Sequence, residues 1–330
     1  MIIDMRNCVF SFSGQVHLDT YALDIERVTV DPDRYDNLAI NSLRLSLEAI
    51  RTQVDSFACW QRRCRLGRPS TNERTLHVSF LVQQLLDLTF RETEGVLAMP
   101  RSYYRLERVP DYSTLSRKLS SRRWTTVLER FIHHIVAALP KRPVVVATDA
   151  TGYSGRKNGW RETKHMQRAL EDWVKVNAAI EVDEFLVLSY ELTKSNVHDS
   201  REFSNVWDQL PNKVVPKRSL ADSAYFGNDC LAAARQRGAA SLHAIKKNAR
   251  NFERPKNFYQ KLVNFAHHWP NRFAAVYTKW AHAETVFSMI GGRFDYRIRC
   301  RSEAGRKNEI RVKLALFDLV LLAMRKEFWC

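Results

Sequence analysis

The chain has 330 residues, of which 45% are apolar, 11% aromatic and 27% charged, with 52 Lys and Arg against 36 Asp and Glu. This apolar content is enough to build a core and excludes an intrinsically disordered protein, while the length fits about two domains. The formal net charge of +16 is typical of proteins that bind polyanions, nucleic acid first among them.

The chain ends and the cysteines set further limits. The N-terminus contains Asp4 and no apolar stretch of signal-peptide length, so we expect a cytoplasmic protein. The apolar run from Leu314 to Met324 is too short for a bilayer, which needs about 20 residues, and predicts a buried helix and no membrane contact. The six cysteines are too few and too scattered for a disulfide scaffold, and we expect them reduced.

The first 140 residues read as helical. Apolar spacing predicts helices over about 38–64 and 75–88, with a turn at 67–72, and then short helices over 90–99 and 110–119. The exposed side of the last one carries Arg117, Lys118, Arg122 and Arg123. This pattern resembles a helix-turn-helix around 85–125, with a solvated basic helix face as the alternative. We therefore assign residues 1–140 to an all-helical N-terminal DNA-binding region.

A sheet begins after Pro143. The β-branched run 144–147 predicts a strand covered on both faces, and 173–182 with 185–192 predicts a hairpin. Beyond them we expect a helix over 198–210, a short strand ending at 219–221, a helix over 228–237, a strand over 240–245, and a helix over 272–289 terminated by Gly291 and Gly292. Residues 141–330 are thus predicted to form an α/β domain, a mixed sheet flanked by helices.

Three carboxylates stand at the predicted element ends. Asp149 directly follows the buried strand, and Asp222 follows the short strand at 219–221, each among small residues. Glu284 lies on a helix whose same face carries Tyr277, Trp280, Phe287 and Ser288, and a charge on such a face needs a partner. A turn or capping role would explain Asp149 alone.

Together, three such carboxylates can hold a pair of Mg²⁺ ions, which prefer oxygen ligands. Two ions about 4 Å apart activate an attacking oxygen and stabilise the leaving oxygen of a phosphodiester. Two histidines near these acids, His198 and His282, have either an active-site role or a structural hydrogen-bonding role.

The motifs around these acids resemble those of DDE transposases of insertion sequences, nearest the IS-four and IS-five groups. The resemblance covers most of the chain: TDATG at 148–152, LADSAYFG at 220–227, HAETVFSMIGGRFDYRIR at 282–299, Asn196 to Ser200, and, upstream, Gly67-Arg68-Pro69 and VPDYSTLSRKL at 109–119.

The resemblance implies an RNase H-like core with Asp149, Asp222 and Glu284 as catalytic metal ligands, and Mg²⁺ as the metal, with Mn²⁺ able to substitute. It also implies recognition of terminal inverted repeats in double-stranded DNA, hydrolysis that releases a 3′-OH, and attack of that hydroxyl on target DNA. Bringing two ends together implies at least a homodimer on DNA, and a location at the nucleoid when bound.

The glutamate helix departs from the relatives' pattern. Many of them carry a Tyr, Arg, Glu, Lys signature there, and in this chain Tyr277 and Glu284 match while Trp280 and Gly291 replace the basic residues. Lys279 and Arg293 are close in sequence and could take over the phosphate contacts.

The expected DNA contacts come from three basic segments, 101–130, 246–261 and 293–313, and from the glutamate helix. They are Arg117, Lys118, Arg122, Arg123, Lys246, Lys247, Tyr277, Lys279 and Arg293. Three other interpretations stay open. The chain could be a decayed transposase or another DNA-binding protein without cleavage activity, another RNase H-like nuclease, or a zinc hydrolase using His282 and Glu284.

Overall fold

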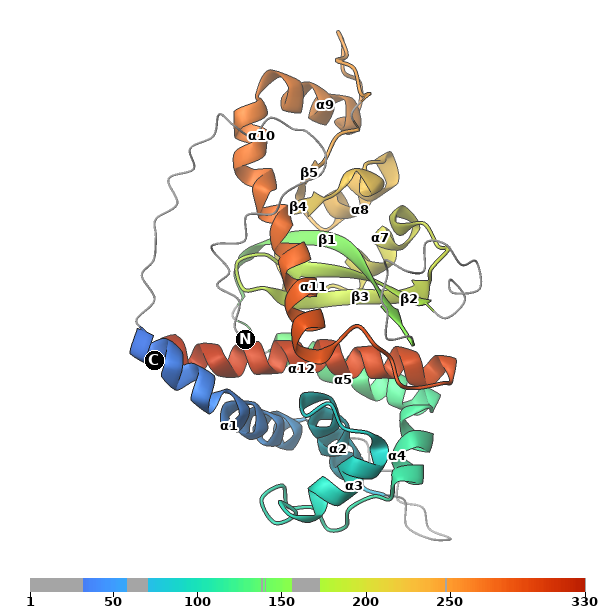
Figure 1. Ribbon diagram of the computed structural model, residues 1–330. Coiled ribbons are helices and arrows are strands. Elements are labelled where there is room, and N and C mark those ends of the chain that lie inside the picture. The colour runs from blue at the N-terminus through green and yellow to red at the C-terminus, as the bar shows by residue number, and fades with distance from the viewer. Residues whose placement is uncertain are drawn as a thin grey trace.

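The computed structural model (Figure 1) describes residues 32–57, 71–137, 139, 141–155, 173–246 and 248–329. A five-stranded sheet lies in the middle of the molecule, and a group of helices gathers around one long helix beneath it. The predicted turn at 67–70, the Gly67-Arg68-Pro69 motif, the expected contact Lys247 and the cysteines at 8, 59, 64 and 330 lie outside the described residues.

The sheet is mixed, as predicted. Its strands are β1 (Pro143–Ser154), β2 (Trp173–Glu181), β3 (Leu186–Lys194), β4 (Val215–Ala221) and β5 (Ala240–His243), in the order β3-β2-β1-β4-β5. The first three strands pair antiparallel, and β4 and β5 join β1 in parallel. This order and these directions agree with the RNase H-like core that the resemblance implies.

One strand boundary was wrong. The sequence placed Asp149 where its strand leaves the sheet, but β1 continues through Asp149 to Ser154. The cause is that β1 has two partners of unequal length. The antiparallel partner β2 pairs with β1 as far as Ser154 and Trp173, whereas the parallel partner β4 stops at Ala221, opposite Thr148. Asp149 therefore lies just past the parallel ladder and inside the antiparallel one.

Helices cover both faces of the sheet. They are α7 (Asp199–Asp208), α8 (Asn228–Gln236), α9 (Phe258–His268), α10 (Pro270–Tyr277), α11 (Ala281–Phe294) and α12 (Glu303–Trp329), with the 3₁₀ turns η2 (Ser223–Tyr225) and η3 (Thr278–Trp280). Trp207 of α7 donates its indole N–H to the Thr148 hydroxyl at 2.9 Å, which puts α7 on the Thr148 face. Since strand side chains alternate, Asp149 points to the opposite face.

The helix around Glu284 differs from the prediction. Instead of one helix over 272–289, the chain forms α10, η3 and α11, and α11 runs through both glycines to Phe294. Gly291 is needed for close packing, because a Cβ there would overlap the ring of Tyr296, whose hydroxyl donates to the Phe287 carbonyl at 2.6 Å. The helix ends instead at Asp295, which takes a positive φ of 59°.

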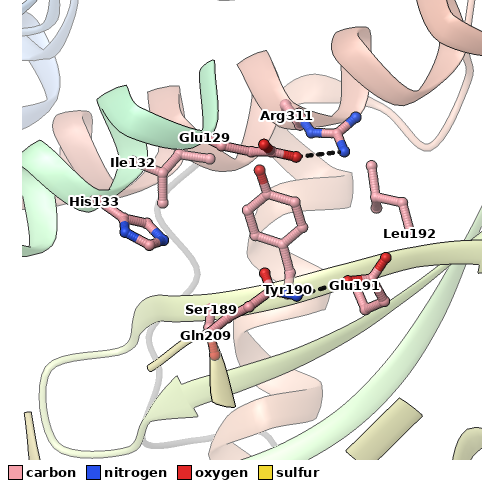
Figure 2. Close-up of a pocket in the computed structure, with 9 residues that line it drawn as sticks. All are labelled: Glu129, Ile132, His133, Ser189, Tyr190, Glu191, Leu192, Gln209 and Arg311. Atoms are coloured by element: carbon pink, nitrogen blue, oxygen red, sulfur yellow. Dashed lines mark hydrogen bonds and ion pairs between the residues drawn. The ribbon is translucent and has the colours of Figure 1, made fainter. Parts of the chain in front are cut away.

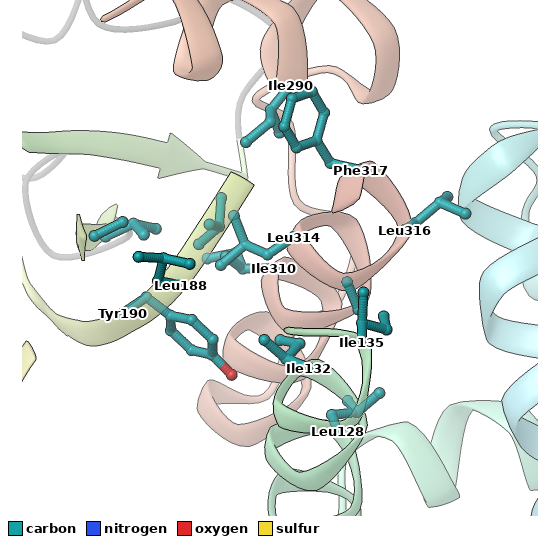
Figure 3. Packing of buried hydrophobic residues seen from close by; sticks show 14 of the residues in the cluster. Leu128, Ile132, Ile135, Leu188, Tyr190, Ile290, Ile310, Leu314, Leu316 and Phe317 are labelled. Atoms are coloured by element: carbon teal, nitrogen blue, oxygen red, sulfur yellow. The ribbon is translucent and has the colours of Figure 1, made fainter. Parts of the chain in front are cut away.

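The N-terminal helices are α1 (Pro32–Ser56), α2 (Glu73–Leu85), α3 (Phe90–Ala98), α4 (Tyr112–Leu119) and α5 (Arg122–Ala137). They pack around α12, which the sequence assigned to the other domain. Figure 3 shows Ile310 and Leu314 of α12 between Ile132 of α5 and Leu188 of β3, within one continuous buried cluster. The helical region and the sheet thus share a core.

The predicted buried helix over 314–324 is the middle of α12, which also buries Lys313 and Asp318. Among the described residues, no helix is long and apolar enough to span a membrane.

The helix-turn-helix geometry expected around 85–125 is not what α3 and α4 form. Residues 99–111 separate these helices, whereas a helix-turn-helix uses a turn of about 3–4 residues. α4 and α5 follow each other after Ser120 and Ser121, and α5 buries Trp124 and Leu128. The basic side chains of this region are therefore carried by a helical cluster docked on α12.

A polar cavity of about 300 Å³ lies where α5, β3 and α12 meet. Figure 2 shows Tyr190 of β3 pointing toward the ion pair of Arg311 and Glu129, whose atoms are 2.9 Å apart. Gln209 donates to Glu191 at 2.7 Å on its β3 side. None of the three predicted catalytic residues lines this cavity.

Candidate active site

The strand register brings the two predicted aspartates side by side. Thr148 of β1 pairs with Ala221 of β4 in the last step of the parallel ladder, so Asp149 and Asp222 occupy the next position on each chain. Parallel strands lie about 4.8 Å apart, which makes the two carboxylates neighbours. Opposite Asp149 on the other side is Ala178, a small buried residue.

Asp222 also shapes the turn that follows β4. Its Oδ1 accepts the backbone N–H of Ala224 at 2.8 Å and caps η2. Tyr225 at the end of that turn donates to Asn177 of β2 at 3.2 Å. His243 of β5 lies 3.1 Å from the Tyr225 carbonyl and 2.9 Å from the Ser219 hydroxyl. The turn is therefore held by side chains of β2 and β5.

Glu284 reaches the same place from α11. It lies in the first turn of that helix, which packs against β1. Burial raises the pKa of Glu284, and the charge of Asp222 raises it further. The charge of Asp222 acts on both Glu284 and Asp149, which indicates that the three acids singled out by the sequence lie in one neighbourhood.

The electrostatics of Asp149 are the most strongly perturbed of the three. Burial is the largest cause that raises its pKa to about 8, and a hydrogen bond from the Ala150 backbone opposes the rise. The charges of Asp222, Glu284 and Asp199 raise it further. Asp149 and Asp222 are each half-buried, so solvent and ligands have access to this cluster.

Tyr277 belongs to the same neighbourhood. Burial raises its pKa well above the usual range, and the charges of Asp222, Asp149 and Glu284 add to the shift. Its ring stacks on Trp280 with centroids 5.9 Å apart and planes 7° apart, and on Phe273 at 5.3 Å. Trp280, which stands where the resemblance led us to expect an arginine, thus completes an aromatic stack.

A fourth acid, Asp199, was missed as a site residue. It begins α7 and its charge raises the pKa of both Asp149 and Asp222. Lys175 of β2 holds it through an ion pair of 2.8 Å and also donates to the Val197 carbonyl at 2.7 Å. The available signal was the segment from Asn196 to Ser200, which resembles a family motif and contains Asp199.

The two histidines make structural hydrogen bonds. His282 lies 2.7 Å from the Val182 carbonyl through Nδ1 and stacks on Phe185. His198 caps α7 and is exposed, although its charge also lowers the pKa of Asp222. A zinc hydrolase built on His282 gains no support, because the described residues contain no group of three His, Cys, Asp or Glu side chains that could hold a metal ion around it.

The expected DNA contacts fall into separate places. Lys279 forms an ion pair with Asp183 at 2.7 Å, and the Arg293 guanidinium lies 3.4 Å from the hydroxyl of Ser46 on α1. Lys246 is exposed after β5. The others, Arg117, Lys118, Arg122 and Arg123, sit on α4 and α5.

The donor set suits Mg²⁺. In the described part of the chain, no three His, Cys, Asp or Glu side chains form a group that could hold a metal ion, so any cation here would be held by fewer protein ligands. Mg²⁺ in phosphoryl-transfer sites is usually held by one or two carboxylates, with waters and substrate phosphates completing its shell. Asp149, Asp222 and Glu284 offer only oxygen ligands and repel one another, so a divalent cation would relieve that repulsion.

Comparison with known proteins gives one family. The transposase DDE domain matches residues 140–321, more than half of the chain, and this range contains all three acids. No curated protein matches the sequence.

Proposed function

Because this chain belongs to the transposase DDE domain family, we propose that it cuts DNA at the ends of an insertion sequence and joins them to target DNA. The observation that carries the proposal is the placement of Asp149 and Asp222 at adjacent strands, with Glu284 on the helix that packs against β1. The charge of Asp222 helps to raise the pKa of both Asp149 and Glu284. A family of DNA-acting enzymes that generally use divalent metals fits this arrangement.

Asp149, Asp222 and Glu284 would hold the cations, and two bound Mg²⁺ or Mn²⁺ ions would polarise the phosphate and activate the attacking oxygen. Asp149 and Asp222 lie on neighbouring strands and fix the positions of their oxygens through the sheet. Glu284 completes the set from α11. The carboxylates must lose their protons to act as ligands, which their raised pKa values oppose in the absence of cations.

We also propose a transposase group, a DNA substrate and an order of reaction steps for this protein. We place the protein in the IS-four or IS-five group, acting on the terminal inverted repeats of double-stranded DNA. The proposed order is hydrolysis to a free 3′-OH and then attack of that hydroxyl on target DNA. Synapsis of two ends would use a homodimer or larger assembly, and the site of action would be the nucleoid in the cytoplasm.

The test is cleavage of a labelled duplex that carries the flanking inverted repeat, with Mg²⁺ or Mn²⁺. We expect the wild type to cut and Glu284→Gln to bind without cutting. Glu253→Gln is the matched control, because Glu253 is exposed and lies outside the three-acid cluster. Equal cutting by Glu284→Gln and the wild type would refute the assignment.

A second candidate is a protein that binds DNA without cutting it, as in a decayed transposase. The replacement of two basic residues by Trp280 and Gly291 favours it. Tyr296 packs over Gly291 and leaves no space for a lysine Cβ. A lysine at position 291 is therefore incompatible with the packing of this helix. Binding by wild type without cleavage in either metal would support this candidate.

A further inference from the structure

A groove of about 660 Å³ lies between the helical cluster and the segment that enters α12. Its walls are the start of α3, one face of α4, and the stretch just before α12. Four arginines and four hydroxyl residues line it together with two aromatic residues: Arg91, Arg117, Arg299 and Arg301, then Thr89, Ser113, Ser116 and Ser120, then Phe90 and Tyr112. We will call this the arginine groove. No carboxylate lines it.

The α4 wall follows from the helix period. Ser113, Ser116, Arg117 and Ser120 recur at spacings of three and four, so they share one face. The opposite side of the helix buries Leu115 and Leu119. Small hydroxyl side chains on the open face leave room for a rod-shaped partner to approach the helix closely, and hydroxyls are common donors to DNA phosphates.

The second wall is the segment that leads into α12. Arg299 and Arg301 of this segment line the groove, whereas the intervening Cys300 does not. Glu309 of α12 fixes this segment by accepting the backbone N–H groups of Arg299 at 3.0 Å and Cys300 at 2.9 Å. The backbone of this wall is therefore fixed by α12.

The acids near the groove are engaged elsewhere. Asp111 caps α4 through the Thr114 N–H at 2.9 Å, and Glu92 caps α3 in a capping box with Thr89. Glu94 accepts the Tyr112 N–H at 2.9 Å. Among the four groove arginines, within the described residues, Arg299 alone pairs with a carboxylate, that of Asp87, at 2.7 Å.

Three arginines are consequently left with uncompensated charge. Within the described residues, Arg91, Arg117 and Arg301 form no ion pair with an acid, and all three are exposed. Arg91 lies over the Tyr112 ring at 4.6 Å, and Arg117 lies 3.3 Å from the Thr114 hydroxyl. Like charges gathered in one groove without acids attract a polyanion.

Hydrogen bonds and close packing join the two walls. Asn308 of α12 donates to the carbonyls of Leu119 at 2.7 Å and Ser121 at 3.2 Å, which docks the end of α4. Gly305 lets the first turn of α12 approach Ser120, since a Cβ there would lie 2.9 Å from the serine hydroxyl. These contacts join the end of α4 to the start of α12.

From this geometry we infer that the arginine groove binds the phosphate backbone of duplex DNA. The inference rests on the proposed function for its substrate class and adds a specific surface to it. Of the residues expected from sequence to contact DNA, Arg117 belongs to this groove, while Arg91, Arg299 and Arg301 were not among them. The groove combines residues from both predicted domains, so duplex DNA would lie across their junction.

The test measures binding of a short labelled duplex of mixed sequence to the full chain in EDTA, where no cutting occurs. Fluorescence anisotropy over about 50 to 200 mM salt gives the slope of log affinity against log salt. The variant with Arg91→Gln, Arg117→Gln and Arg301→Gln should lose about three units of that slope and bind at least about tenfold more weakly. All three side chains are exposed, so its Tm should match that of the wild type.

Arg235→Gln on α8 is the matched control, since Arg235 is exposed and lies outside the groove; its slope should fall by less than that of any single groove variant. Single-stranded DNA and anionic phospholipid vesicles are tested beside the duplex. An unchanged slope in the triple variant would overturn the inference, as would tighter groove-dependent binding of either alternative ligand.

The outcomes separate the two proposals. A wild type that binds duplex through the groove and never cuts contradicts the proposed function and leaves the groove standing. A wild type that cuts, beside a triple variant that binds DNA normally, contradicts the groove alone.

Discussion

Asp149 at the sheet and Asp318 inside α12 are both acids with raised pKa values, yet their surroundings differ. Asp318 is fully buried, and its pKa is raised well above the usual range by burial, against one hydrogen bond from the Val187 backbone. That bond, at 3.0 Å, ties α12 to β3. Asp149 is half-buried, and three other acids raise its pKa further.

The comparison shows that a raised pKa does not by itself identify a catalytic group. Burial suffices for Asp318, which acts as a neutral structural acid inside the core. The Asp149 site differs because the charges of three other acids act on it and it is only half-buried, so the proposed cation would find oxygen ligands there. Replacing Asp149 should therefore abolish DNA cleavage without lowering stability. Replacing Asp318 should lower stability and leave cleavage intact.

The largest expected effect is that of Asp149→Asn on DNA cleavage. Losing one ligand of a two-cation site removes several kcal/mol of transition-state stabilisation, or about a thousandfold in rate. The free energy of unfolding without metal should stay the same or rise, because a repelling charge is gone. Cleavage rates and urea unfolding of the variant measure both, with Asp229→Asn on the surface of α8 as the control. Normal cleavage would remove Asp149 from the site.

Asp318→Ala should instead lower stability and leave cleavage unchanged. The Val187 N–H would lose its acceptor inside the core, which costs about 1–3 kcal/mol of unfolding free energy. Asp318→Asn keeps an acceptor oxygen and should cost less. Cleavage below the unfolding temperature should persist in both variants. A loss of cleavage in folded Asp318→Asn would show that the two acids are coupled.

A smaller effect is the pH dependence of stabilisation by Mg²⁺. The folded pKa of Asp149 is about 8, above its ordinary value, so without metal this group makes the protein less stable as pH rises toward 8. Mg²⁺ binds the ionised acids in competition with protons, so it should raise Tm more at pH 8 than at pH 6. The melting temperature with Mg²⁺ or EDTA at each pH is the measurement.

Two variants sharpen that result. Asp149→Asn should remove most of the Mg²⁺-dependent rise in Tm, whereas Asp318→Asn should leave it intact, since Asp318 is fully enclosed in the core. An equal Mg²⁺ effect at both pH values in the wild type would contradict the assignment of the metal site to these acids.

Local patterns predicted much of the fold and all three acids. The β-branched run before Asp149, the small residues around Asp222 and the helical spacing around Glu284 are properties of short segments. The mixed sheet and the transposase family were confirmed. The roles of the three acids as metal ligands and of the basic residues as DNA contacts remain predictions.

Other features depend on partners distant in the sequence. β1 continues past Asp149 because β2 pairs with it there, and α11 continues through Gly291 because Tyr296 packs on that glycine. Asp199 reaches the site through the placement of α7, and Arg301 meets Arg117 only because α12 docks α4.

The sequence by itself determined which segments become strands and helices and which carboxylates follow them, since these depend on side-chain period and on nearest neighbours. The tertiary structure decided where strands end, which acids shift one another's pKa values and which arginines form a groove. The physical reason is that strand pairing, burial and charge repulsion act between residues that are near in space, whatever their separation along the chain.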